Sequence, residues 1–199
     1  MPTAPFLNPS RDELQASGRG ARSGETYLTL PGVYLIATST FTTTINTDVY
    51  HAIRVESPIV VDQLLMEVTA GAVGNARIGL YRADRSWQPI GAPLADSGNI
   101  DVSANGVKTY TPGTPVFLAR GRYLTVFNTS VEHAVRIYRG DVLGMTAIDS
   151  TLGATALFAD VEVGRTYAAF PTPGTAWSTQ GASQGVPSAH IVFMRVSAP

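Results

Sequence analysis

Hydrophobic and polar residues alternate through the first half of the chain with the period of two that β-strands show. The alternation is clearest in residues 50–56, 61–69 and 76–82. The side chains predicted to face a core are His51, Ile53, Val55, Leu64, Met66, Val68, Ile78 and Leu80. Those predicted to face outward are Tyr50, Arg54, Glu56, Gln63, Glu67, Thr69, Arg77 and Tyr81. Gly79 interrupts the third segment and predicts a bulge or a close approach of another group to the backbone.

Further strands are predicted where Val, Ile, Thr, Tyr and Phe gather, at residues 27–30, 33–40, 114–119, 122–129, 134–140 and 189–197. The last of these is apolar on both faces, as a central strand is. Turn residues punctuate the middle of the chain, and Asn105-Gly106 predicts a type I′ hairpin. About ten short strands without alternating helices predict an all-β protein, a two-sheet antiparallel β-sandwich of the jelly-roll type.

The N-terminal residues 1–26 differ from the rest, and we interpret them as an arm ahead of a sandwich domain over 27–199, with its core from about residue 46. Ser10-Arg11-Asp12-Glu13 has the form of a capping box and predicts a short helix over 11–17. The glycine-rich segment after it reads as a linker. Such an arm either docks on a partner subunit, through Phe6, Leu7 and Leu14, or stays disordered.

Composition narrows the classes of function. The chain has 199 residues, 15% of them charged, and a net charge of −1, so it has no electrostatic footprint for nucleic acid. It has no cysteine, which excludes a disulfide framework, a cysteine zinc site and a thiol nucleophile. Neither a signal peptide nor a membrane span is predicted, so we expect a soluble product of a cytoplasm with no membrane insertion.

No catalytic motif stands out. His51, His133 and His190 lie on three separate predicted strands with no histidine neighbour at strand or helix spacing, so we expect structural or surface histidines, with a metal site or a triad as the alternative. The chain has neither a G-x-S-x-G elbow nor an S-x-x-K motif, and the glycine-rich GRGARSG lacks the lysine and context of a P-loop. We therefore expect no cofactor and no enzymatic activity.

The two tryptophans offer a candidate binding site. Trp87 and Trp177 both lie in predicted loops among small polar residues. An aromatic ring on a loop is a platform on which a sugar ring stacks, and Asp84, Arg85 and Gln88 are candidate partners for its hydroxyls. The alternative, which burial of indole favours, is that each tryptophan plugs the end of the core or a subunit contact.

Residues 59–128, about a third of the chain, resemble a module of structural proteins of tailed bacteriophages and gene transfer agents. The resemblance is carried by VDQLLMEVTAGAVGNARIGLYRAD, then the turn-rich PIGAPLADSGNIDVSANGVKTYTPG, then LARGRYL. It implies a jelly-roll sandwich of the kind found in tail fibres, head fibres or spikes and receptor-binding proteins, usually as homotrimers. Such modules also resemble carbohydrate-binding modules in shape.

Three hypotheses follow. The first is a non-enzymatic virion component, a fibre, spike or decoration subunit assembled with other virion proteins in a bacterial cytoplasm and anchored by its N-terminal arm. The second is a module that binds a polysaccharide of the host cell surface through Trp87 or Trp177. The third is a hydrolase of such a glycan, which needs two carboxylates facing each other at glycosidase separation.

Overall fold

The computed structural model describes residues 26–27, 33–55, 58–85, 88–142, 161–172 and 189–197. In these ranges the chain is all-β, as predicted, and none of them forms a helix long and apolar enough to cross a membrane. Several of the predictions fall outside the described residues. These are the expected N-terminal helix and the candidate residues Phe6, Leu7, Leu14, Trp87 and Trp177.

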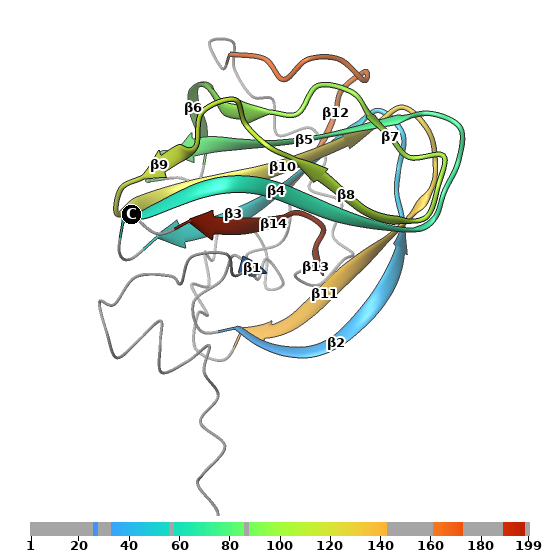
Figure 1. Ribbon diagram of the computed structural model, residues 1–199, viewed down its shortest axis with the longest axis horizontal. Coiled ribbons are helices and arrows are strands. Elements are labelled where there is room, and N and C mark those ends of the chain that lie inside the picture. The colour runs from blue at the N-terminus through green and yellow to red at the C-terminus, as the bar shows by residue number, and fades with distance from the viewer. Residues whose placement is uncertain are drawn as a thin grey trace, which may run out of the picture.

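Two antiparallel sheets pack face to face, as the alternation predicted (Figure 1). The first sheet contains β2 (Val33–Thr42), β11 (Ala134–Val142), β4 (Ile59–Ala70), β8 (Gly106–Tyr110) and β9 (Val116–Leu118), where β8 and β9 pair successively along one side of β4. The second contains β12 (Val161–Gly164), β3 (Thr47–Val55), β10 (Gly121–Thr129), β5 (Asn75–Ala83), β6 (Pro89–Asp96) and β7 (Ile100–Asp101).

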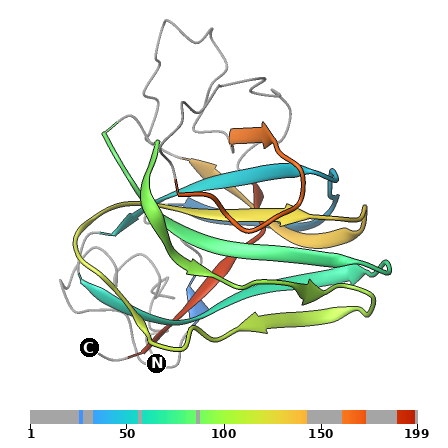
Figure 2. The ribbon, with the colours of Figure 1, turned by 90° about the horizontal axis from the view of Figure 1, so that it is seen from above.

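The chain passes back and forth between the two sheets. It changes sheet at each step from β2 to β3, β4 and β5, and it stays in the second sheet through β6 and β7. It then crosses to the first sheet for β8 and β9, returns to the second for β10 and crosses to the first again for β11. The orders β2-β11-β4-β8/β9 and β3-β10-β5-β6 are those of a jelly roll. The turns after β2, β4, β7 and β10 gather at one end of the sandwich, drawn at the right of Figures 1 and 2.

The C-terminal strand is central, as predicted, but it is interrupted. It divides into β13 (Ala189–His190), which pairs with β11, and β14 (Phe193–Ser197), which lies between β4 and β1 (Thr26–Tyr27). The cause is the divergence of β11 from β4, because the two strands pair only at Ala134 and Val135. The chain crosses this fork at Ile191 and Val192, which are both buried.

The core between the sheets consists of the side chains that the alternation placed inward. Each of them is 5% exposed or less, and the three strands concerned contribute His51, Ile53, Val55, Leu64, Met66, Val68, Ile78 and Leu80. Burial of each large apolar side chain contributes roughly 1.5–3 kcal/mol.

The prediction of a type I′ hairpin at Asn105-Gly106 is wrong. Gly106 has a φ of +121°, but among the described non-glycine residues only Asn46 has a positive φ, whereas a type I′ turn needs it at both central positions. The segment instead connects β7 of the second sheet to β8 of the first. The Asn105 side chain supports this crossing, because its Oδ1 accepts a hydrogen bond from the backbone nitrogen of Gly71 at 2.8 Å.

Candidate functional site

The outer face of the second sheet is covered by the segment that follows β12, residues 165–171 (Figure 1). Tyr50 and Tyr81 lie on this outward face, as predicted, but they are only 2% and 0% exposed. With Phe170, Leu124 and Val126 they form a second apolar cluster, separate from the core between the sheets. The ring of Phe170 meets that of Tyr81 edge-on, with centroids 6.4 Å apart.

A buried carboxylate anchors one end of the covering segment. Asp48, 1% exposed, pairs with the guanidinium of Arg165, whose Nη2 lies 2.9 Å from Oδ1 and whose Nε contacts Oδ2. The Tyr50 hydroxyl donates to Oδ2 at 3.1 Å, and the Asn128 amide donates to Oδ1. Burial opposes the charge on Arg165, but the hydrogen bond and the negative charge of Asp48 raise its pKa. Charge and donors are therefore matched around this buried acid.

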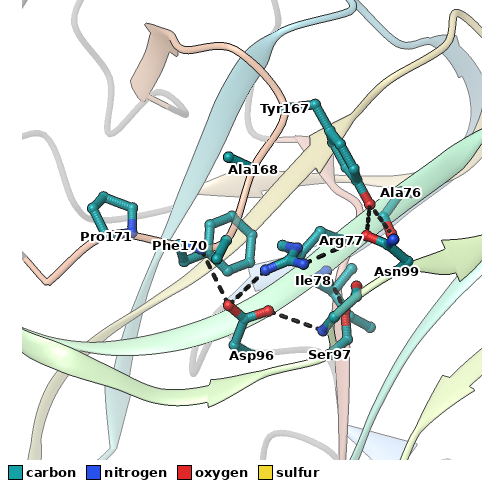
Figure 3. A network of polar contacts seen from close by, with 12 residues as sticks. Ala76, Arg77, Ile78, Asp96, Ser97, Asn99, Tyr167, Ala168, Phe170 and Pro171 are labelled. Atoms are coloured by element: carbon teal, nitrogen blue, oxygen red, sulfur yellow. Dashed lines mark hydrogen bonds and ion pairs between the residues drawn. The ribbon is translucent and has the colours of Figure 1, made fainter.

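A second set of polar contacts holds the rest of the segment (Figure 3). Asp96 on β6 accepts from the Arg77 Nη1 at 3.0 Å and from the backbone nitrogen of Phe170 at 3.1 Å. The Tyr167 hydroxyl is 3.0 Å from Asn99 Oδ1, and it donates to the Ala76 carbonyl at 3.1 Å. The Arg77 guanidinium lies 5.9 Å from the centroids of both the Tyr167 and Phe170 rings. These contacts fasten the segment across β5 and β6.

The two buried phenols act as neutral donors. Burial is the largest cause that raises the pKa of Tyr50 and of Tyr81, and the charge of Asp48 raises both further. The Tyr81 hydroxyl accordingly donates to the Pro171 carbonyl at 2.7 Å. Sequence reasoning missed that residues 165–171 cover the second sheet. Tyr167, Phe170 and two prolines after β12 were the available signal that this segment packs against another part of the chain.

Three of the five predicted glycan-binding residues, Asp84, Arg85 and Gln88, lie between β5 and β6. The Asp84 nitrogen donates to the Gln88 carbonyl, and the Gln88 nitrogen donates to Asp84 Oδ1, both at 2.9 Å. Arg85 is exposed on this turn, and its carbonyl accepts from Arg122 Nη1. The structure thus brings Asp84, Arg85 and Gln88 together, and Asp84 Oδ1 holds Gln88 through its backbone nitrogen.

Arginines surround this turn, which sequence reasoning missed. Strand pairing sets Arg122 of β10 opposite Arg54 of β3, and places Tyr123, the next residue, opposite Arg82 of β5. Arg85 and Arg120 lie in the loops beside them. We call these five residues, Arg54, Arg82, Arg85, Arg120 and Arg122, the arginine rim. Their positions at strand ends were the available signal. The register places Arg82 beside the inward-facing Tyr123 and Arg122 on the outer face of the same sheet.

The histidines lie apart from these features. His51 is buried in the core on β3, and His133 is 4% exposed in the turn between β10 and β11, whereas the side chain of His190 on β13 lies outside the described set. His133 Nδ1 donates to the Val131 carbonyl at 3.0 Å, and burial lowers its pKa. Within the described ranges no group of histidines and carboxylates could hold a metal ion.

Two more carboxylates, on the outer face of the first sheet, pair with arginines. Glu67 lies 3.2 Å from Arg136 Nη2, and Asp62 lies 2.8 Å from Arg195 Nε.

Comparison of the chain with protein-family models, with curated proteins and with solved structures finds no match. The function must therefore be argued from the fold and from these surfaces.

Proposed function

We propose that this chain is a non-enzymatic structural subunit of a tailed phage or phage-like particle, a fibre, spike or decoration protein that forms a homotrimer. The observation that carries the proposal is an exposed apolar edge on the first sheet. Val107 on β8 is 63% exposed and Phe117 on β9 is 60% exposed. Both lie on the strands that end this sheet, and their outward neighbours on β4 are Glu67 and Val60.

An exposed edge with large apolar side chains is a template for contact with another chain. The edge strand of the second sheet is different, because β6 carries Pro93 and a left-handed Gly91, which disfavour pairing with a further strand. The edge of the first sheet formed by β8 and β9 is thus suited to assembly, and this edge of the second sheet is protected. The jelly-roll strand order supports the resemblance to phage structural modules, and closed symmetric contacts would stabilise a chain without cysteine.

The test is the oligomeric state of the full chain, measured by sedimentation equilibrium. We expect a trimer that Phe117→Asp and Val107→Asp convert to monomers of unchanged thermal stability. Val73→Asp is the matched control, because Val73 is 92% exposed in the turn between β4 and β5 and belongs to neither β8 nor β9. A wild-type chain that stays monomeric at high concentration would overturn the proposed assembly.

Deletion of the N-terminal arm tests whether the arm attaches the chain to a particle. A chain that lacks residues 1–26 should fold but fail to join the particle, whereas normal incorporation would remove the docking role of Phe6, Leu7 and Leu14.

A second candidate function is recognition of a host cell-surface polysaccharide. The observation that favours it is the pair of hydrogen bonds between Asp84 and Gln88, beside which Arg85 is exposed at the end of the sandwich opposite to the gathered turns. Quenching of tryptophan fluorescence by polysaccharide, lost in Trp87→Ala or Trp177→Ala, would support it. No response across a panel of glycans would contradict it.

A further inference from the structure

Asn105 and Gly106 place a side-chain amide next to an unhindered backbone nitrogen, where the chain crosses from β7 to β8 at the right of Figure 1. Asn105 is the only asparagine of the chain that a glycine follows. Both residues are exposed, and nothing lies within 4 Å of the Cβ position of Gly106. Because glycine has no side chain to crowd its own nitrogen, that nitrogen can approach the Asn105 Cγ atom.

The carbonyl group of the Asn105 side chain is polarised by a backbone donor. Its Oδ1 atom accepts a hydrogen bond from the Gly71 nitrogen at 2.8 Å. Such a donor stabilises the negative charge that develops on a carbonyl oxygen when a nucleophile adds to the carbon. In the part of the chain that the structure describes, no group accepts a hydrogen bond from Asn105 Nδ2, so this nitrogen is not held in place.

The Gly71 donor is fixed by its neighbours. A Cβ atom at Gly71 would stand 2.5 Å from the Ser103 carbonyl oxygen, so the two backbones are in close contact. The next nitrogen, that of Ala72, donates to the Val102 carbonyl at 3.0 Å. The hydrogen-bond donor at Asn105 is therefore preorganised by the contact between the turn after β4 and the crossing after β7.

The attacking nitrogen belongs to the first residue of a strand. Gly106 begins β8, pairs with Val68 and so occupies the last position of the β4–β8 ladder. Among the described strands, β8 pairs with β4 alone. Strand ends open more readily than strand interiors, so Gly106 can leave the ladder while the rest of β8 stays paired.

We propose that Asn105 is a site of self-modification, at which the folded chain converts its own asparagine to aspartate and isoaspartate. A solvent base removes the proton of the Gly106 nitrogen, and this nitrogen forms a bond to Asn105 Cγ. The bond between Cγ and Nδ2 then breaks, and the amide nitrogen takes a proton from water and leaves as ammonia.

The second step consumes water and opens the cyclic imide. Attack of water at Cγ restores the original main chain and gives aspartate. Attack at the main-chain carbonyl of residue 105 gives isoaspartate, in which the main chain runs through Cγ. The sum of both steps is hydrolysis of one amide by one water, with release of ammonia, so no oxidant or cofactor is needed.

Two other exposed asparagines, Asn46 and Asn99, lack this arrangement. They precede Thr47 and Ile100, whose branched Cβ atoms crowd the nitrogen that would attack. The proposed modification is independent of the assembly proposed above, although it falls two residues before Val107, on the exposed edge strand.

The experiment follows the ageing of the full chain at neutral and at mildly alkaline pH, in buffer and in guanidinium chloride. Trypsin cleaves after arginine and lysine, so Asn99 and Asn105 fall in one peptide, residues 86–108, and Asn99 is an internal control. Fragmentation mass spectrometry locates the replacement of NH by O, and an isoaspartyl methyltransferase assay counts isoaspartate. The variants are Asn105→Gln, which keeps the carbonyl but needs a larger ring, and Asn99→Gln as its matched control.

We expect Asn105 of the folded chain to convert about tenfold faster than Asn99, because of both the glycine and the Gly71 donor. Conversion should be faster at the higher pH and at least as fast in the folded chain as in guanidinium chloride. Asn105→Gln should abolish the release of ammonia and the isoaspartate, whereas Asn99→Gln should change neither. Equal rates at Asn99 and Asn105 would overturn the inference. Conversion of Asn105 that is slower in the folded chain than in guanidinium chloride would show that the fold protects this pair, and would overturn it too.

Discussion

Phe170 lies over Gly79 so closely that a Cβ at Gly79 would stand 2.8 Å from two carbons of the Phe170 ring. The close approach that Gly79 predicted is therefore made by a ring from a segment 91 residues away, 170 less 79. We expect Gly79→Ala to displace this ring and to destabilise the fold by about 1–3 kcal/mol, as overpacking does. Urea unfolding measures the loss. Gly113→Ala is the control, because nothing lies within 4 Å of its Cβ position and its φ is not positive.

The same prediction has a second, independent check. If the ring of Phe170 is what the methyl group meets, then Phe170→Ala should remove most of the penalty of Gly79→Ala in a double-mutant cycle. The Ala95 carbonyl, 2.9 Å from the same Cβ position, would retain a smaller part of it. A penalty that survives intact in the Phe170→Ala background would contradict the assignment.

The ion pair between Asp48 and Arg165 should be worth more than those on the outer face of the first sheet. The side chain of Asp48 is 1% exposed and that of Arg165 is 21% exposed. Removing one partner therefore leaves an unpaired charge or unsatisfied hydrogen-bonding groups in a buried position. We expect Asp48→Asn to cost about 2–4 kcal/mol. Asp62→Asn, in a pair whose side chains are 19% and 35% exposed, should cost about 1 kcal/mol or less. Equal costs in chemical denaturation would show that burial does not set the difference.

The inward faces of β3, β4 and β5 could be predicted because strand side chains alternate, and that periodicity is local in the sequence. The covered outer face could not, since Tyr50 and Tyr81 are buried by residues 165–171, and alternation shows only which side of a sheet a residue occupies. The interruption at Ile191 was equally hidden, because it depends on where β11 leaves β4.

The candidate site divides in the same way. Asp84, Arg85 and Gln88 could be grouped from the sequence because they belong to one turn. The arginine rim could not, because its members come from β3, β5, β10 and the loops beside them, and only the register of those strands shows which face of the sheet a member occupies. The outer strand formed by β8 and β9 needed the sheet order as well, since exposure of Phe117 follows from its position at an edge.

His133 should make the fold sensitive to mild acid. Its Nδ1 bonds to a carbonyl, and its Nε2 is buried without a hydrogen-bond partner among the described residues, so protonation would bury an unpaired donor. Burial lowers its pKa in the folded chain, so below the unfolded value of about 6.5 the unfolded chain binds more protons. The stability it contributes is present above that pH and is lost as the pH falls towards the folded pKa.

Chemical denaturation between neutral pH and pH ~5 measures this loss, about 1.4 kcal/mol for each unit of pKa difference. His133→Asn, which keeps a donor near Val131, should flatten the profile. Glu132→Gln, at the exposed neighbouring position, should not. A wild-type profile that His133→Asn leaves unaltered would rule out this histidine as the cause.

Tyr50 and Tyr81 should resist ionisation until the covering segment leaves. Burial raises the pKa of both hydroxyls above the ordinary value of about 10, so in alkali the unfolded chain loses protons that the folded chain retains. Their contribution to stability is thus present below pH ~10 and is lost as the pH rises above it. In a titration followed by tyrosinate absorbance, we expect part of the signal from the eight tyrosines to appear only together with loss of tertiary structure. Tyr81→Phe should remove a share of that late signal. A wild-type chain in which all tyrosines ionise while the fold remains intact would mean that residues 165–171 open readily in solution.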